Sequence, residues 1–455
     1  MRRLKKKSVH TAPGKTSGRK APLALTVSSL AWGGKAVGRH EGKVIFVSKA
    51  VPGDHLLVVL DRVKSRYAEG RIEAVLRPGE DRVDPKCKFF SHCGGCQWLP
   101  VRYARQLKEK EELVRTILRH HMTGIPVEPI VPSESATAYR HRGNFHVVRS
   151  GQEVRIGFYQ EQSHHVVNVD HCLLFDGDYN SLYGRLRSAL KEEPAARFLE
   201  GLTLARSEAG DHYSIHLKMG KEGKQDSWSV LADVAEKAGC AGVLVTPSLE
   251  PEEVHARRGA PLVRFGLERD RGTPGELEMT ADIRSFTQVQ YAMNRRMVQT
   301  VIAWLGLGRH ERLLDVYSGV GNFALPLALG CSEVLAVESS PFAHADAKEN
   351  AARNAIYNVK QLPGDAGEWV KNLAAKSEKF DAILLDPPRT GAQGALENLG
   401  HLGARRILYV SCNLPSLDRD LSDLRRTGYV PVRLQPWDLF PQTYGVEILC
   451  LLEKR

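Results

Sequence analysis

Apolar and polar positions alternate in short runs over the first part of the chain, from about residue 22 to 80. The runs have a period of two and are separated by Gly, Pro and Asp, which is typical of β-strands joined by tight turns. Short strands at such close and even spacing predict a small closed β-barrel of the OB-like kind. Barrels of this kind bind single-stranded nucleic acid in some proteins and are structural modules in others, so the pattern leaves both roles open.

A second pattern continues to about residue 280 and mixes helical and strand periods, which predicts an α+β region. Its first helix is "YARQLKEKEELVRTILRH", in which apolar residues recur at helical spacing. In the segments after it, arginines interleave with aromatic residues: Arg140, Arg142, Arg149 and Arg155 with Tyr139, Phe145 and Phe158. Nucleic-acid bases could stack on these aromatic rings while the arginines pair with the phosphates. An antiparallel hairpin with one apolar and one basic face would show the same pattern. We favour the structural interpretation.

The third pattern, from about residue 281 to 455, alternates strands with helices. The stretch "RLLDVYSGVGNFALPLALG" has the form strand, glycine turn, helix, and further strands follow in "SEVLAVESS", "FDAILLDPP", "RRILYVSC" and "VEILCLLEK". This alternation predicts a doubly wound α/β sheet with mainly parallel strands. Ligands of such sheets bind beyond the carboxyl ends of the strands, so the residues that follow these strands are candidates for a site.

Length and charge narrow the class of protein. A chain of 455 residues should divide into two or three domains, and it lacks the run of about 18 apolar residues that a membrane helix needs. The net charge of +11 comes mostly from residues 1–20, which carry eight Lys or Arg and no acid, because the 56 bases and 53 acids of the remaining chain leave only +3. We expect this tail to be disordered and to serve either as a nucleic-acid arm or as a solvated tail.

The apolar segment after the tail, "APLALTVSSLAW", could be mistaken for part of an export signal. Thr26, Ser28 and Ser29 interrupt it, and it continues into alternating, strand-like sequence. We therefore expect a cytoplasmic protein without a membrane partner.

Three of the eight cysteines, Cys87, Cys93 and Cys96, fall within ten residues in "CKFFSHCGGC". In a long chain without an export signal, this spacing indicates a metal or iron–sulfur centre more than disulfides, and the two glycines allow the tight turn that such a centre needs. The fourth ligand could be Cys172 or Cys240. The spacing does not separate zinc from iron–sulfur, and ordinary surface or core thiols stay an alternative.

The glycine turn of the third region predicts a nucleoside cofactor. Gly319 and Gly321 remove side chains where a cofactor can lie against the backbone, and Glu338 ends the next strand, where it can accept hydrogen bonds from ribose hydroxyls. These features suit NAD and S-adenosylmethionine equally.

Two later strand ends favour methyl transfer over hydride transfer. One strand ends in Asp386-Pro387-Pro388-Arg389 and the next in Ser411-Cys412-Asn413. Hydride transfer does not need a cysteine at this edge. Addition to a pyrimidine does, because a thiolate at C6 makes C5 nucleophilic, after which a base must remove the C5 proton from a nucleotide taken out of its stack. Most cysteines on apolar strands are buried structural thiols, but the position of Cys412 at the strand exit favours a nucleophile.

The motifs together resemble the RNA uracil-C5 methyltransferase family, in the branch that has an N-terminal TRAM barrel and an iron–sulfur cluster and methylates 23S ribosomal RNA. The resemblance covers nearly the whole chain beyond the tail and rests on "CKFFSHCGGC", "VDHCLL", "SFTQVQ", "LLDVYSGVGNF", "AVES", "LLDPPRTG", "YVSCN" and "VEILCLL". It implies a basic tail (1–20), a TRAM or OB-like barrel (21–80), a central α+β domain with the cluster (81–280) and a Rossmann-like, S-adenosylmethionine-dependent methyltransferase domain (281–455).

The resemblance also implies roles for individual residues. A [4Fe-4S] cluster would bind to Cys87, Cys93, Cys96 and Cys172. Cys412 would be the nucleophile and Glu447 the base that removes the proton. S-adenosylmethionine would contact Gln288, Tyr317, Asn322, Glu338, Asp365 and Asp386, together with the turn of Gly319 and Gly321. We expect a monomer that acts on RNA.

The sequence departs from the family pattern at three places. Gln290 stands where the family often has Asn, Tyr317-Ser318 replaces a common Phe-Cys pair, and Asp365 stands where relatives carry Asn. Neither Cys412 nor Glu447 is affected. Without the family, Glu447 would equally suit a structural acid that pairs with a base or caps a strand.

Other functions stay open at this stage. Transfer RNA is an alternative substrate for the same chemistry. A cytosine-C5 methyltransferase would normally carry a second cysteine in the loop where Arg389 stands. An iron–sulfur oxidoreductase leaves Cys412 unexplained, and a non-catalytic RNA-binding scaffold would not depend on Cys412 at all.

Overall fold

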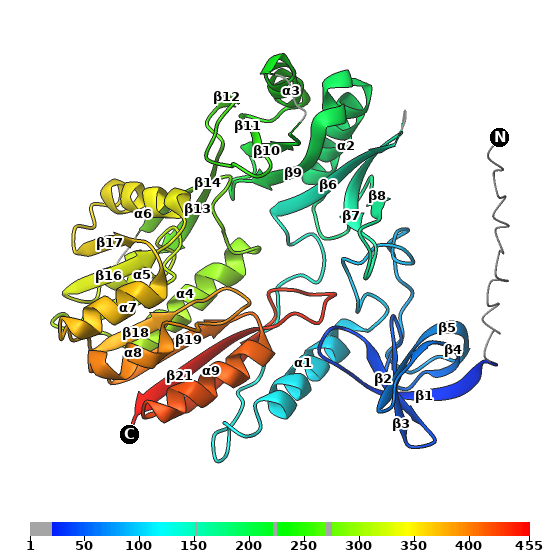
Figure 1. Cartoon of the computed structure of the whole chain (residues 1–455), viewed down its shortest axis with the longest axis horizontal. Coiled ribbons are helices and arrows are strands. Elements are labelled where there is room, and N and C mark those ends of the chain that lie inside the picture. Colours follow the sequence, from blue (N-terminus) through cyan, green and yellow to red (C-terminus); the bar gives the residue numbers. More distant parts are fainter. Residues whose placement is uncertain (1–20, 151–152, 222–224, 270–274) are drawn as a thin grey trace, which may run out of the picture. The chain divides into compact units, whose positions relative to one another are not determined.

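The computed structural model describes residues 21–150, 153–221, 225–269 and 275–455 (Figure 1). The predicted basic tail, residues 1–20, lies outside the described residues. The chain forms two compact units. One contains Lys35–Arg82 and the strand that ends before Ala31, and the other contains Trp32–Gly34 and Val83–Arg455. Because the second unit is continuous from Val83 onward, the predicted domain boundary near residue 280 stays a prediction.

The first unit is a closed five-stranded barrel, as the period-two pattern predicts. Its strands follow the order β1-β2-β3-β5-β4, and all neighbours are antiparallel except β3 and β5. Every second residue points inward along most of β1, where Leu25 and Val27 are buried. The strands are β1 (Leu23–Leu30), β2 (Ala36–His40), β3 (Lys43–Val47), β4 (His55–Val63) and β5 (Tyr67–Arg77).

The second unit begins with α1 (Tyr103–Ile117) and a seven-stranded mixed sheet of order β12-β11-β10-β9-β6-β7-β8. Two helices, α2 (Gly177–Glu192) and α3 (Gln225–Ala238), pack on this sheet and bury an apolar core with it (Figure 1). The strands are β6 (Arg142–Ser150), β7 (Glu153–Tyr159), β8 (Val166–Asn168), β9 (Leu199–Arg206), β10 (Tyr213–Met219), β11 (Gly242–Pro247) and β12 (Ala256–Gly259), with a 3-10 helix at Pro194–Phe198.

The interleaved arginines and aromatics of this region have structural partners. Phe145 stacks on Phe158 with ring centroids 4.9 Å apart, inside the core. The guanidinium of Arg142 donates to the carbonyl oxygens of Ser285 and Ile283, both at 2.6 Å. Tyr139 donates its hydroxyl to the carbonyl of Pro441 at 3.0 Å. These contacts agree with the structural interpretation of the pattern.

A hairpin of β13 (Leu262–Glu268) and β14 (Glu276–Asp282) leads into α4 (Tyr291–Leu305) and the last sheet, whose order is β17-β16-β15-β18-β19-β21-β20. The first five strands in this order are parallel, and β21 and β20 are antiparallel to their neighbours. The strands are β15 (Arg312–Val316), β16 (Glu333–Glu338), β17 (Val359–Pro363), β18 (Ala382–Leu385), β19 (Arg406–Ser411), β20 (Tyr429–Trp437) and β21 (Glu447–Lys454).

Helices cover this sheet, so its central strands are buried along their whole length, as in β18, and read as continuous apolar runs. They are α4, α5 (Ala324–Ala328), α6 (Pro341–Arg353), α7 (Ala366–Ala375), α8 (Leu396–Leu399) and α9 (Leu414–Arg426), with a 3-10 helix at Gly400–Leu402. The predicted doubly wound sheet is confirmed. Among the described residues, every helix is too short or too polar to cross a membrane.

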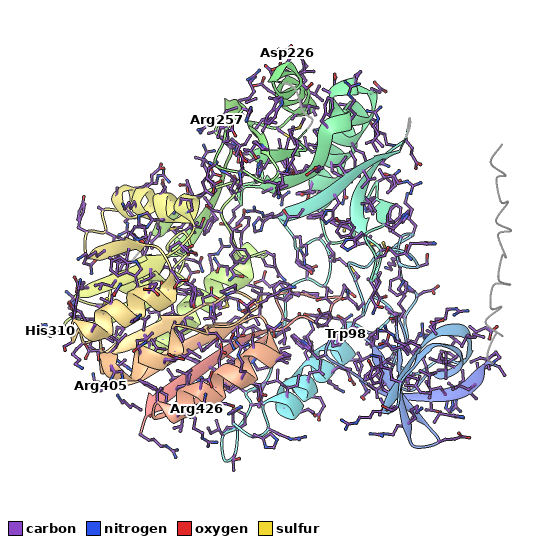
Figure 2. All side chains as sticks on the ribbon, in the orientation of Figure 1. Trp98, Asp226, Arg257, His310, Arg405 and Arg426 are labelled. Atoms are coloured by element: carbon purple, nitrogen blue, oxygen red, sulfur yellow. The ribbon has the colours of Figure 1, made fainter. Side chains whose placement is uncertain are left out.

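The strand order reverses between β15 and β18, which makes their carboxyl ends the expected ligand edge of the sheet. The opposite ends face solvent. His310 and Arg405, which precede β15 and β19, are exposed and lie at the outer edge of the side-chain view (Figure 2). The candidate residues therefore gather at the end of the sheet that points away from His310 and Arg405.

Candidate active site

The turn after β15 brings two neighbouring strands together through the backbone. Tyr317, Gly319 and Gly321 all have positive φ angles, of 71°, 56° and 88°. The Tyr317 N–H donates to the carbonyl oxygen of Val337 at 3.0 Å. The Gly319 N–H donates to Oε2 of Glu338 at 2.9 Å, so the carboxylate at the end of β16 is held against the glycine turn. A Cβ atom on Gly319 would meet no atom within 4 Å, which leaves free space beside the turn.

Three carboxyl groups gather at this edge, on Asp315, Glu338 and Asp386. Asp315 is fully buried, and neither of its carboxyl oxygens has a hydrogen-bond partner of normal geometry among the described residues. Burial raises the pKa of Asp315 well above its usual range, Asp386 and Glu338 raise it further, and the Ala324 N–H opposes the rise without cancelling it. Burial and the nearby Glu338 raise the pKa of Asp386 to about 7.

Among the described residues, acids and no basic side chain contribute to the pKa values of Asp315 and Asp386, so ionising either carboxyl group is unfavourable without a counter-charge. A ligand that carries positive charge would supply the missing counter-charge. The sulfonium and ammonium groups of S-adenosylmethionine meet that requirement, and the free space beside Gly319 meets the need for backbone approach. The residues present therefore fit this cofactor. Sequence reasoning missed Asp315, although an Asp inside an otherwise apolar strand was a usable signal.

Cys412 directly follows β19 and lies near Glu447, the first residue of the neighbouring strand β21. In the antiparallel pairing of β19 with β21, Ser411 is opposite Ile448, so Cys412, one residue further along, comes next to Glu447. Asn413 begins α9, where its side chain accepts the Ser416 N–H at 3.0 Å. The thiol therefore stands at a strand-to-helix junction, fixed on both sides.

The two groups act on each other's ionisation. Burial raises the pKa of the Cys412 thiol to about 12, and the carboxylates of Glu447 and Asp386 contribute to the rise. Burial also raises the pKa of Glu447 well above its usual range, with Asp386 as the nearby negative charge. Burial therefore favours the neutral form of both groups in the free protein.

Arg389 opposes both shifts. Its guanidinium charge and a hydrogen bond to the thiol lower the pKa of Cys412, and its charge lowers that of Glu447. In the sequence, Arg389 is distinguished only by its position after the two prolines. Its closeness to Cys412 depends on strands β18 and β19 lying next to each other, which spacing alone does not reveal.

Three other predicted cofactor residues have different surroundings. Gln288 is buried in the segment between β14 and α4. Asn322 exchanges two hydrogen bonds with Asn294, at 2.8 and 3.0 Å. Asp365 is exposed and caps α7 by accepting the Glu368 N–H at 3.0 Å. Asn322 and Asp365 thus already have structural roles.

The four cysteines predicted as cluster ligands line a single cavity of about 460 Å³: Cys87, Cys93, Cys96 and Cys172. Burial raises the pKa of Cys96, with Cys172 and Cys93 as further causes, and burial raises that of Cys172 to about 11. Cys240, the alternative fourth ligand, is buried in the core under α3 instead. Within the described ranges, no group of three or more His, Cys, Asp or Glu side chains is arranged to hold a metal ion. The donor chemistry fits a thiolate-bound centre, but the iron–sulfur cluster stays a prediction.

Comparisons with known proteins give one consistent result. Residues 277–455 match the family described as tRNA (Uracil-5-)-methyltransferase. An uncharacterized RNA methyltransferase of Thermosynechococcus vestitus is 34% identical over 95% of this chain and 98% of its own length. The 23S rRNA (uracil(1939)-C(5))-methyltransferase RlmD of Aeromonas hydrophila is 31% identical over 97% of this chain and 99% of its own.

A solved structure has the same fold over nearly the whole chain. It is the Pyrococcus abyssi tRNA (uracil-54, C5)-methyltransferase in complex with S-adenosyl-L-homocysteine, with a TM-score of 0.72 and 23% identity. The match covers 94% of this chain and all of that one. At this identity the likeness concerns the fold alone.

Proposed function

The chain belongs to the RNA uracil-C5 methyltransferase family, and from this premise we propose that it methylates C5 of a uridine in 23S ribosomal RNA through a covalent adduct with Cys412. The enzyme depends on S-adenosylmethionine. Relatives named as 23S rRNA methyltransferases that match over almost their full length support the ribosomal substrate.

The observation that most supports the covalent chemistry is the closeness of Cys412 and Glu447. Both lie one residue beyond the Ser411–Ile448 pair of β19 and β21, and the charge of Glu447 acts on the thiol. A nucleophile at C6 and a base at C5 must act on adjacent atoms of one ring, so their side chains must come from adjacent positions. A structural thiol would need neither a buried acid nor an arginine beside it.

The proposed reaction has three steps: addition of the thiolate, methyl transfer and elimination. The Cys412 thiolate adds to C6 of uracil, and the electrons of the C5–C6 double bond move toward O4 as an enolate. When bound, S-adenosylmethionine would supply the electrophilic methyl group that C5 takes up, with the S–CH3 bond breaking and S-adenosylhomocysteine as the leaving group. Glu447 as carboxylate removes the remaining proton from C5, the C5–C6 double bond re-forms, and the C6–S bond breaks to release the thiolate.

Arg389 supports the first step in this proposal. The thiol must lose its proton although burial and two acids disfavour the thiolate. The guanidinium lowers the pKa of the thiol, and the proton is released to solvent as the nucleotide enters, so Glu447 stays free to take the C5 proton in the last step. Ionisation of Cys412 is thus tied to the arrangement of Arg389 and Glu447.

For the cofactor, the residues proposed to hold the nucleoside are Glu338 and the turn of Gly319 and Gly321. Asp386, with buried Asp315 behind it, would face the positive groups, and Gln288 and Tyr317 would line the remaining contact. Asn322 and Asp365 stay in the proposed set as flanking residues, since their own hydrogen bonds hold the surrounding backbone.

We also propose that Cys87, Cys93, Cys96 and Cys172 bind a [4Fe-4S] cluster. Their shared cavity supports this, because four thiols from two distant segments line it. The cluster would tie these segments together and take no part in methyl transfer, which is not a redox reaction.

The test is methyl transfer from labelled S-adenosylmethionine to unmodified ribosomal and transfer RNA, followed by nucleoside mass spectrometry. We expect 5-methyluridine in 23S ribosomal RNA with the wild type and none with Cys412→Ala. Cys450→Ala is the matched control, because Cys450 is a buried thiol of β21 on the same sheet. Label in transfer RNA alone would replace the ribosomal substrate, and full activity of Cys412→Ala would refute the covalent mechanism.

A further inference from the structure

The loop Asp438–Val446 joins β20 to β21 directly before Glu447. Trp437, at the end of β20, pairs with Glu447, at the start of β21. The loop therefore leaves and re-enters the sheet at the position of the proposed base. Any shift of the loop backbone would be passed to the Glu447 carboxyl group.

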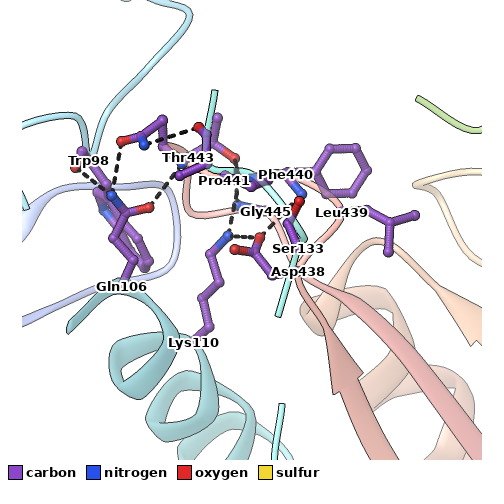
Figure 3. A network of polar contacts seen from close by, with 12 residues as sticks. Trp98, Gln106, Lys110, Ser133, Asp438, Leu439, Phe440, Pro441, Thr443 and Gly445 are labelled. Carbon is purple, nitrogen blue, oxygen red and sulfur yellow. Dashed lines mark hydrogen bonds and ion pairs between the residues drawn. The ribbon is translucent and has the colours of Figure 1, made fainter. Parts of the chain in front are cut away.

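Helix α1 binds this loop through a buried charge pair (Figure 3). Nζ of Lys110 lies 2.6 Å from Oδ1 of Asp438 and donates to the carbonyl oxygen of Phe440 at 3.0 Å. Both charged side chains are fully buried. Replacing a buried ion pair with apolar residues is often neutral or stabilising, so such a pair is weak evidence for a role in stability alone and suits a role in fixing one arrangement.

A second contact holds the most strained residue of the loop. Gln442 has φ +70°, a conformation that side-chain-bearing residues rarely adopt. Its N–H donates to Oε1 of Gln106 at 2.9 Å, its carbonyl accepts the Trp98 N–H at 2.9 Å, and its side-chain Oε1 accepts Nε2 of Gln106 at 2.9 Å. Strain of this kind persists only where the surroundings over-determine it, and it concentrates at functional sites.

A third contact comes from Gln290, the position where the sequence departs from the family pattern. Its Nε2 donates to the carbonyl oxygen of Leu439 at 2.8 Å, and its Oε1 accepts the Ser133 hydroxyl at 2.8 Å. Gln290 is buried and stands two residues after Gln288, just before α4. Its amide therefore bridges the loop and the segment of Ser133, instead of reaching the cofactor.

We propose that Gln106, Lys110 and Gln290 are positioning residues that hold the loop Asp438–Val446 and so place Glu447 for removal of the C5 proton. The inference rests on the proposed function. In the described part of the chain, these three side chains contact atoms of the loop, Ser133, the backbone of Trp98 and Val101, and the Trp98 ring, so they act on Glu447 through the loop.

The order of the chemical steps makes this role separable from a structural one. Glu447 acts after the C6–S bond has formed and after C5 has received its methyl group. A displaced carboxylate therefore leaves these two bonds able to form and slows only the loss of the C5 proton with cleavage of C6–S. RNA that is methylated and still bound to Cys412 should accumulate.

The experiment is a rapid-quench time course with labelled S-adenosylmethionine and 23S ribosomal RNA fragments, which separates denaturant-stable protein–RNA adduct from free methylated RNA. Gln290→Leu removes both amide contacts at similar volume. We expect adduct to form near the wild-type rate and to resolve between about tenfold and a hundredfold more slowly. Gln299→Leu is the matched control, because Gln299 is an equally buried glutamine on α4 whose amide donates only to Glu268 and Arg269 carbonyls.

A second variant keeps the test decisive if Gln290→Leu does not fold. The double change Lys110→Met with Asp438→Leu removes the ion pair without leaving an unpaired buried charge, so it should fold while losing the contact to Phe440. Slow adduct resolution in both variants supports the inference. Resolution at the wild-type rate overturns it, and so does a parallel loss of adduct formation and product, which is the mark of a purely structural role. Absence of 5-methyluridine with the wild type would instead refute the proposed function.

Discussion

At the residue scale, the candidate site gathers ionisable groups whose neutral forms are favoured by burial. Asp386, Glu447 and Cys412 all have raised pKa values, and Arg389 is the cation that opposes the shift at two of them. Burial of unpaired acids destabilises the free protein. It also prepares the site for a cationic cofactor and for proton transfer, which is the usual compromise at an active site.

Glu447→Gln should stop turnover after methyl transfer. An amide cannot take the C5 proton, so methylated adduct should accumulate, and product formation should fall by at least about a hundredfold. Gel electrophoresis under denaturing conditions with labelled RNA measures the adduct. Equal loss of adduct and product would assign Glu447 a role before methyl transfer.

The affinity for S-adenosylmethionine should rise with pH through about 7. Only ionised Asp386 can pair with the cofactor's positive charge, and its pKa in the free protein is about 7 because of burial and Glu338. The other groups that face it are Asp315, Cys412 and Glu447, with Arg389 beside the last two. Titration calorimetry should show binding about tenfold weaker at pH 6 than at pH 8. The Asp386→Asn variant should bind S-adenosylmethionine weakly at both pH values, so its affinity should not rise with pH.

The same carboxyl group should make the free protein less stable as pH rises. The pKa of Asp386 is higher in the folded chain than in the unfolded one, so its protonated form favours folding, and that contribution is lost between about pH 4 and 7. Asp386→Asn should therefore raise the melting temperature at pH 8 in the absence of cofactor. A fall in melting temperature would show that the carboxylate has a compensating partner.

At the element scale, the turn between β15 and α5 places strict limits on which residues it accepts. Gly321 has φ +88°, and a Cβ atom there would lie 2.9 Å from the side chain of Leu325. The Gly319 N–H donates to the Glu338 carboxylate, so a shift at Gly321 also moves this carboxylate, which we propose holds the cofactor's nucleoside.

Gly321→Ala should destabilise the protein by about 1–2 kcal/mol and weaken cofactor binding. Gly184→Ala is the matched control, because Gly184 is inside α2 and a Cβ there meets no atom within 4 Å. That change should be neutral or stabilising. Thermal denaturation and cofactor titration measure both effects, and equal behaviour of the two variants would contradict the strain argument.

At the scale of the whole molecule, the two segments that carry the four clustered cysteines come together around one cavity. If they bind iron, Cys172→Ala should lower the iron and sulfide content of protein purified without oxygen and should lower its melting temperature. Cys240→Ala should change neither metal content nor visible absorption, because Cys240 lies in the core under α3. Unchanged iron in Cys172→Ala would remove Cys172 from the ligand set.

The sequence by itself determined the layout of elements. Period-two runs specify strands with one buried face, which predicted the barrel, and apolar runs between helices specify a parallel sheet buried on both faces. It also placed Asp386 and Cys412 at strand ends, because the carboxyl ends of parallel strands share one edge. These features depend on residues that are close together in the sequence, so local sequence patterns are sufficient to predict them.

Only the tertiary structure decided which groups meet. Cys412 comes near Glu447 because β19 and β21 are neighbours whose register ends at Ser411 and Ile448. Arg389 reaches the thiol because β18 lies beside β19. The apolar spacing of α1 also gave no sign that Gln106 and Lys110 are buried on its inner face, where they hold a loop more than 300 positions away. Burying Gln106 and Lys110 is favourable only because the loop provides hydrogen-bond and charge partners. Contacts between such distant segments do not produce a periodic sequence pattern in either segment, so the sequence alone does not reveal them.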